Sequence, residues 1–125
     1  MHRKQVAQRV APLIAAGLVA TCAPLDFEAL FSARDPQDYE QIRADRRSAY
    51  EYLPVLDEHW HWAMDVQRSL AGVSRHRDVG LTDLLVAAVA EQHRMTILHY
   101  DSDYETISEF TSVQAMWVVE RGDIT

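Results

Sequence analysis

The chain has 125 residues, the size of one domain, and 48% of them are hydrophobic, which is enough to form a core. Its formal net charge is −7, so the total charge lends no support to binding along a nucleic-acid duplex, although it does not exclude a nucleic-acid substrate. The single cysteine excludes an intramolecular disulfide framework. No apolar run reaches the roughly 18 residues of a membrane span. We therefore expect one cytoplasmic domain covering residues 1–125.

The first elements follow from apolar spacing and glycine. Residues 2–16 have the periodicity of an amphipathic helix, and Gly17 is placed to end it. Residues 18–23 are almost wholly apolar, which predicts a short strand covered on both faces. Cys22 lies in this run, and we expect its thiol to be buried and inert.

Prolines mark the next elements. Pro24 opens a second helix, and we expect Phe27 and Phe31 to face the core from it. An aspartate-proline pair starts a third helix over residues 36–49. Residues 50–55 have the alternating side-chain pattern of a strand and contain a proline, which predicts a short edge strand.

The second half of the chain repeats the alternation of helices and strands. Asp57 is expected to cap a helix. We expect His59 and His61 to be ordinary surface residues of this helix and not a metal-binding pair, since side chains two positions apart on a helix point in different directions. The nearly continuous apolar segment 79–90 predicts the most buried helix. We expect the last elements to be a strand at 96–100, a helix at 104–110 and a strand at 116–119. Strands separated by helices predict an α/β fold with a parallel sheet.

Acidic residues are expected to meet at one edge of this sheet, because strand ends and the starts of the following helices share that edge. Glu28 follows the strand 18–23, Asp83 opens the buried helix, and Asp101 and Asp103 follow the strand 96–100. Crowded carboxylates repel one another, and a divalent cation removes that cost. Oxygen-only ligands favour Mg²⁺ or Mn²⁺. A cation held in this way supports phosphodiester hydrolysis.

The segments 79–90 and 97–104 together resemble the C-terminal half of VapC-like PIN-domain ribonucleases, in which an aspartate opens an alanine-rich helix and a strand ends in Asp-x-Asp-aromatic. Residues 24–30 look like the helix that carries the family glutamate. The resemblance implies a PIN-like three-layer α/β/α sandwich with a central parallel sheet. It assigns Glu28, Asp83 and Asp103 to the metal, with Asp101 as a further catalytic acid.

The resemblance also implies a function and partners. The family uses Mg²⁺ or Mn²⁺ to cleave RNA, often structured RNA such as tRNA, as the toxin of a type II toxin–antitoxin pair. A VapB-like antitoxin and a homodimer are then expected. Family members begin with a central strand ending in an aspartate, whereas this sequence begins inside the following helix, so we expect that strand and its aspartate to be missing. The alternatives are a catalytically inactive PIN remnant that binds only an antitoxin or a second protomer, and a purely structural α/β domain.

Basic residues supply candidates for contacts with RNA or a partner. Arg75 and Arg77 lie in a polar loop, residues 71–78, and either meet RNA phosphates near the acids or remain solvated. A second basic group lies in the helix 36–49 and is either a solvated helix face or part of a partner surface: Arg43, Arg46 and Arg47.

Overall fold

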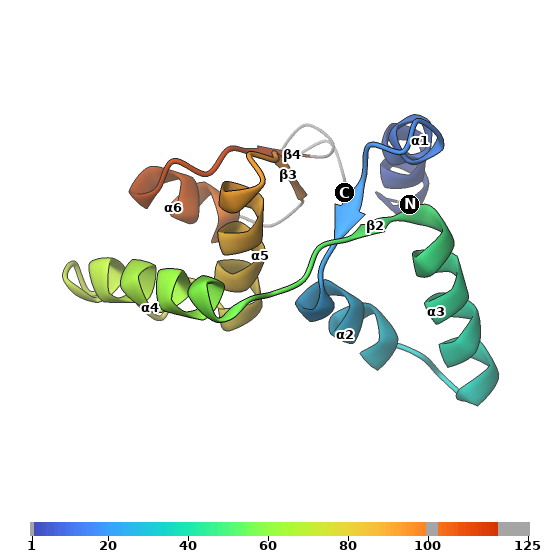
Figure 1. The fold of residues 1–125 in the computed structure, drawn as a ribbon, viewed down its shortest axis with the longest axis horizontal. Helices are drawn as coiled ribbons and strands as arrows, with labels where there is room; N and C mark the ends of the chain where they lie inside the picture. The colour runs from blue at the N-terminus through green and yellow to red at the C-terminus, as the bar shows by residue number, and fades with distance from the viewer. Residues whose placement is uncertain (1, 100–102, 118–125) are drawn as a thin grey trace.

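The computed structural model describes residues 2–99 and 103–117, in which there are six helices and four short strands (Figure 1). In chain order they are α1 (His2–Ala15), β1 (Ala20–Thr21), α2 (Ala23–Phe31), α3 (Pro36–Ala49), β2 (Glu51–Tyr52), α4 (Asp57–Ala71), α5 (Leu81–Gln92), β3 (Ile97–His99), α6 (Asp103–Phe110) and β4 (Ala115–Trp117). None of the helices in the described ranges is long and apolar enough to cross a membrane.

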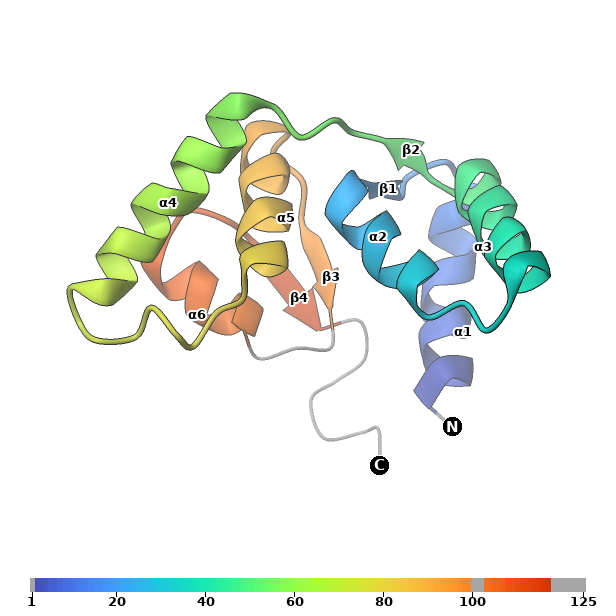
Figure 2. The ribbon, with the colours of Figure 1, turned by 90° about the horizontal axis from the view of Figure 1, so that it is seen from below.

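The elements form two halves that lie side by side (Figures 1 and 2). The N-terminal half contains α1, β1, α2, α3 and β2, and its two strands pair in parallel with Ala20 opposite Glu51. The C-terminal half contains α4, α5, β3, α6 and β4, and its two strands pair in parallel with Leu98 opposite Met116. The segment from β2 to α4 connects the halves, and α2 contacts α5 across them.

The core is centred on α5, as its sequence predicts. Every residue from Leu84 to Ala90 is buried, and α4 and α6 pack against this helix. Leu70 of α4 and Ile107 of α6 are fully buried beside it. The N-terminal half adds the buried Cys22 and the partly buried Leu25 to the same cluster. One apolar helix therefore holds both halves together, mainly through hydrophobic burial.

The α/β class and the parallel pairing are confirmed, but the described strands do not form one continuous sheet. They form two sheets of two strands each, β1 with β2 and β3 with β4. No backbone ladder joins β1 to β3 within the described residues, so side chains alone connect the two sheets.

Two expectations about helix faces were wrong. Phe27 and Phe31 are 75% and 93% exposed, because α2 begins at Ala23 and directs Leu25 toward the core, which turns positions 27 and 31 outward. His59 is 3% exposed and not a surface residue, because it shares with Leu70 the buried face of α4.

Candidate functional site

Two of the predicted acids begin neighbouring helices. Asp83 lies in the first turn of α5, and Asp103 is the first residue of α6. Both side chains are half-buried, and the two helices contact each other. The partial positive charge at a helix N-terminus favours a carboxylate at each position, which offsets part of the cost of placing Asp83 next to an apolar helix.

Aromatic side chains pack around the start of α6. The buried ring of His99, at the end of β3, lies 5.2 Å from the ring of Tyr104 and 4.8 Å from that of Trp117. The indole Nε1–H of Trp117 donates a hydrogen bond to Glu105 Oε1 at 2.7 Å. These contacts fix the first turn of α6, and therefore the backbone position of Asp103, against β3 and β4.

The structure does not join Glu28 to these two acids. Glu28 is exposed on α2, in the N-terminal half, whereas Asp83 and Asp103 belong to the C-terminal half. Asp101 lies outside the described residues. Among the residues that the structure describes, no three of His, Cys, Asp and Glu lie close enough together to hold a metal ion. The described acids thus do not fit a three-ligand Mg²⁺ or Mn²⁺ site, and the predicted metal and catalytic set stays a prediction.

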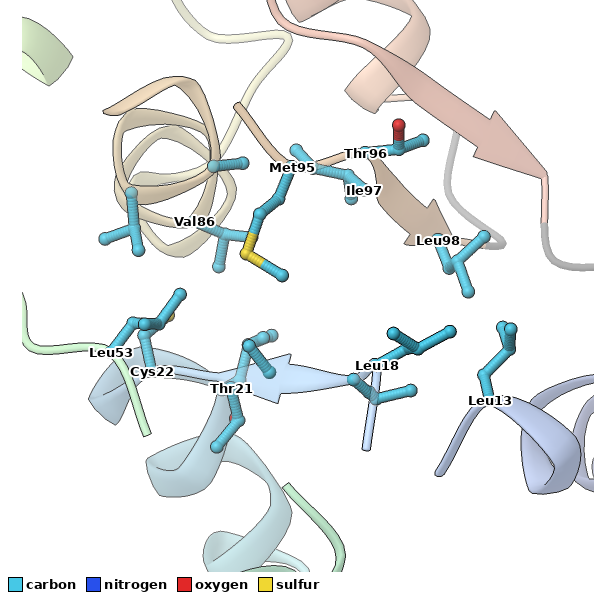
Figure 3. Close-up of a pocket in the computed structure, with 15 residues that line it drawn as sticks. Leu13, Leu18, Thr21, Cys22, Leu53, Val86, Met95, Thr96, Ile97 and Leu98 are labelled. Atoms are coloured by element: carbon cyan, nitrogen blue, oxygen red, sulfur yellow. The ribbon is translucent and has the colours of Figure 1, made fainter. Parts of the chain in front are cut away.

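The separation of the acids follows from the separation of the sheets. An apolar groove with a volume of about 170 Å³ lies between the two sheets (Figure 3). Val86 and Met95 border it from the C-terminal half, facing Cys22 of the N-terminal half, and Leu98 points toward Leu18. The side chains that line this groove are mostly apolar, and none of them is a carboxylate or an imidazole, so we assign no acid–base chemistry to it.

The thiol of Cys22 borders this groove but is 3% exposed. Burial raises its pKa above the ordinary value, with the carboxylate of Asp26 adding to the effect and a backbone hydrogen bond from Leu25 opposing it. The expected burial of Cys22 is confirmed, and since its thiol rather than its thiolate is favoured, its inertness stays a prediction.

A polar cluster that the sequence analysis missed lies at the end of β1. Arg46 Nε donates to Asp26 Oδ1 at 2.9 Å, and Arg46 Nη2 donates to Thr21 Oγ1 at 3.1 Å. The Thr21 hydroxyl in turn donates to Asp26 Oδ1 at 3.0 Å. The three residues come from β1, α2 and α3. The signal for Asp26 was its place in the first turn of a proline-started helix, but nothing local paired it with an arginine twenty residues away.

The two candidate RNA-binding arginines differ in their surroundings. The guanidinium of Arg75 donates to Asp78 Oδ2 at 3.1 Å and to Glu109 Oε2 and Thr106 Oγ1 at 3.2 Å each. The hydrogen bonds that Arg75 donates to the carboxylates of Asp78 and Glu109 raise the pKa of Arg75. Arg75 thus fastens its loop to α6, whereas Arg77 is exposed and makes no ion pair within the described ranges.

The family model of the PIN domain matches residues 2–109, and the chain therefore belongs to the PIN domain family. Among its relatives is ribonuclease VapC21 of Mycobacterium tuberculosis, which is 39% identical over 121 residues, 97% of this chain and 88% of the relative. Ribonuclease VapC51 of the same organism is 34% identical over 124 residues, 99% of this chain and 89% of the relative.

Solved structures agree with this family. VapBC-5 of Mycobacterium tuberculosis, a member of the VapBC family of toxin–antitoxin systems, superposes with a TM-score of 0.62 at 26% identity, covering 79% of this chain and 81% of that one. VapBC2 of Rickettsia felis, bound to a DNA fragment from its promoter, gives a TM-score of 0.69 at 12% identity, and the match covers 87% of this chain and 81% of that one. The second likeness bears on the fold alone, and together they confirm the PIN-like fold.

Proposed function

We propose that this protein is an endoribonuclease that hydrolyses RNA phosphodiester bonds as the toxin of a type II toxin–antitoxin pair. The observation that carries the proposal is the pair of half-buried acids, Asp83 and Asp103, each in the first turn of one of two packed helices. The names of the relatives, which are ribonucleases of the VapC type, support the same reaction.

Hydrolysis requires water to attack phosphorus and one ribose oxygen to leave with a proton. A carboxylate next to the scissile phosphate accepts the proton of that water. We assign this role to Asp83, with Asp103, at the start of the neighbouring helix, as the second acid. We also propose that cleavage depends on Mg²⁺ or Mn²⁺, although the described acids do not by themselves make a three-ligand site.

The test is RNA cleavage by the Asp83→Asn variant. This substitution keeps the size of the side chain and removes its negative charge, so we expect cleavage to fall at least about a hundredfold while the thermal midpoint changes little. Asp65→Asn, on the exposed face of α4, makes the same chemical change and should leave cleavage intact. Assays with Mg²⁺, Mn²⁺ or EDTA test the metal dependence. Cleavage by Asp83→Asn at the wild-type rate would contradict the proposal.

The partners proposed for this chain are a VapB-like antitoxin and a second copy. Both structural neighbours are VapBC proteins, and VapBC-5 is a member of a family of toxin–antitoxin systems, which favours the antitoxin. Size-exclusion chromatography with light scattering, with and without the antitoxin, measures both associations. A chain that elutes as a monomer at micromolar concentration and does not change on addition of antitoxin would contradict them.

A second candidate function is binding without catalysis, as an inactive PIN domain. The observation that favours it is that the exposed Glu28 does not join Asp83 and Asp103 in a metal-holding group. The same cleavage assay decides between the two. Antitoxin binding by wild-type protein that cleaves no RNA in either metal supports the binding function alone.

A further inference from the structure

A pocket with a volume of about 300 Å³ lies between α2, α3 and the first sheet, and neither Asp83 nor Asp103 lines it. Three arginines of α3 line it: Arg43, and three and four residues later Arg46 and Arg47. One acid, Asp26, also lines it, so its side chains carry a net charge of +2 (three arginines less one aspartate) in a chain whose net charge is −7. The pocket therefore selects an anion.

One of the three arginines is fixed by the protein itself. Arg46 bonds Asp26 and Thr21, and its guanidinium carbon lies 5.0 Å from the centre of the Tyr50 ring. This pairing neutralises Asp26, so that acid no longer repels an incoming anion. Arg46 thus builds one wall of the pocket and is not the principal ligand group.

The other two arginines are available for a ligand. Arg43 Nη1 lies 3.9 Å from Glu40 Oε2, and both side chains are largely exposed, so that ion pair contributes little. Arg47 is exposed and forms no ion pair within the described part of the chain. The two lie one helical turn apart, and together they present two guanidinium groups, which suit the oxygens of a phosphate.

An aromatic ring completes the pocket. Tyr52, in β2, lines it and is 56% exposed, although aromatic side chains are usually buried. A flat, accessible ring beside a pair of phosphate-binding cations is the arrangement that receives one nucleotide of a single strand, its base stacked on the ring. An acidic peptide from a partner would also bind the arginines, so the loss of partner binding is measured as a separate outcome of the test.

We propose that this pocket, formed by Arg43, Arg47 and Tyr52, is a nucleotide-binding subsite for single-stranded RNA. The inference rests on the proposed function, since it extends the RNA-cleaving site to a second contact with the substrate. Arg43 and Arg47 hold a backbone phosphate, and Tyr52 stacks the adjoining base.

The experiment measures RNA binding separately from RNA cleavage. The probe is a fluorescein-labelled adenosine hexanucleotide, and fluorescence anisotropy is recorded in EDTA over a range of salt concentrations. The double variant R43Q/R47Q should bind at least about tenfold more weakly, and the magnitude of the slope of log affinity against log salt should fall by about 0.7, because the contact with one phosphate is lost. The matched control is R9Q/R68Q, which removes two exposed arginines from α1 and α4.

Substitutions at Tyr52 test the stacking. Y52A should weaken binding at least about fivefold, whereas Y52F keeps the ring and should bind like the wild type. Equal binding by R43Q/R47Q and R9Q/R68Q, with equal salt slopes, would overturn the inference. So would normal RNA binding by R43Q/R47Q together with loss of antitoxin binding, which would assign the pocket to an acidic segment of the partner.

The two proposals fail in distinguishable ways. If the wild type binds RNA through this pocket but cleaves none in Mg²⁺ or Mn²⁺, the subsite stands and the proposed catalysis fails. If the wild type cleaves RNA and R43Q/R47Q binds and cleaves equally well, the subsite fails and the catalysis stands.

Discussion

Replacing His59 with leucine removes two hydrogen bonds from a side chain that is 3% exposed. His59 Nδ1 accepts from the backbone N–H of Leu56 at 2.8 Å, so the neutral ring carries its proton on Nε2, where it donates to Gln92 Oε1. The first bond caps the start of α4, and the second ties α4 to the end of α5. Leucine keeps much of the buried volume but leaves the amide of Leu56 without its acceptor.

An unsatisfied amide of this kind costs about 1–3 kcal/mol of folding free energy. The lost bond to Gln92 adds little to this cost, because the exposed side chain of Gln92 forms a hydrogen bond with water instead. At roughly 4 °C per kcal/mol for a domain of this size, the thermal midpoint should fall by about 4–12 °C, which differential scanning calorimetry measures. His61→Leu is the matched control, because the one partner of His61 among the described residues is the exposed Asp57, and its replacement should cost no more than about 0.5 kcal/mol. A His59→Leu midpoint equal to or above that of His61→Leu would refute the reasoning.

Three further predictions concern packing, the thiol and the basic loop. Leu70→Ala should destabilise the fold by about 2–5 kcal/mol in chemical denaturation, since Leu70 is fully buried, and a loss below 1 kcal/mol would contradict its place in the core. Cys22 should react with a thiol reagent only on unfolding, and because its pKa is raised in the folded state, stability should fall as pH rises above about 9, where the unfolded chain releases this proton first. Arg75→Gln should lower the thermal midpoint more than Arg77→Gln, and the reverse order would contradict the anchoring of the loop to α6.

Local signals predicted the elements well. The aspartate-proline pair placed α3 at Pro36–Ala49, where the structure has it, and the apolar run 79–90 identified α5 as the most buried helix. The predicted ends of the strands were less accurate: the strand expected over residues 18–23 is only the two-residue β1 in the structure. The reason is that helix caps and periodicity are encoded nearby in the sequence, whereas a strand extends only as far as a neighbouring strand pairs with it.

Long-range arrangement was harder to predict. The face that α2 turns inward depends on where the helix begins, and Phe27 was placed wrongly for that reason. His59 looked like a surface residue because its partners, the amide of Leu56 and the side chain of Gln92, are not evident from spacing. Among the acids, Asp83 was correctly placed in the first turn of its helix, whereas Asp103 was expected at the end of a strand and is the first residue of α6. Their distance from Glu28 depends on how the two halves dock, which no local pattern specifies.

The split into two small sheets bears on how the protein loses its structure. Backbone ladders lie inside each half, so the halves can separate without breaking a ladder, at the expense only of apolar contacts around the groove. Amide hydrogens of α5 should exchange most slowly, and those of β1 and β2 much sooner. Unfolding is then expected to proceed in two stages rather than one, with the N-terminal half opening first, so a single melting temperature would describe only the sturdier portion of the molecule.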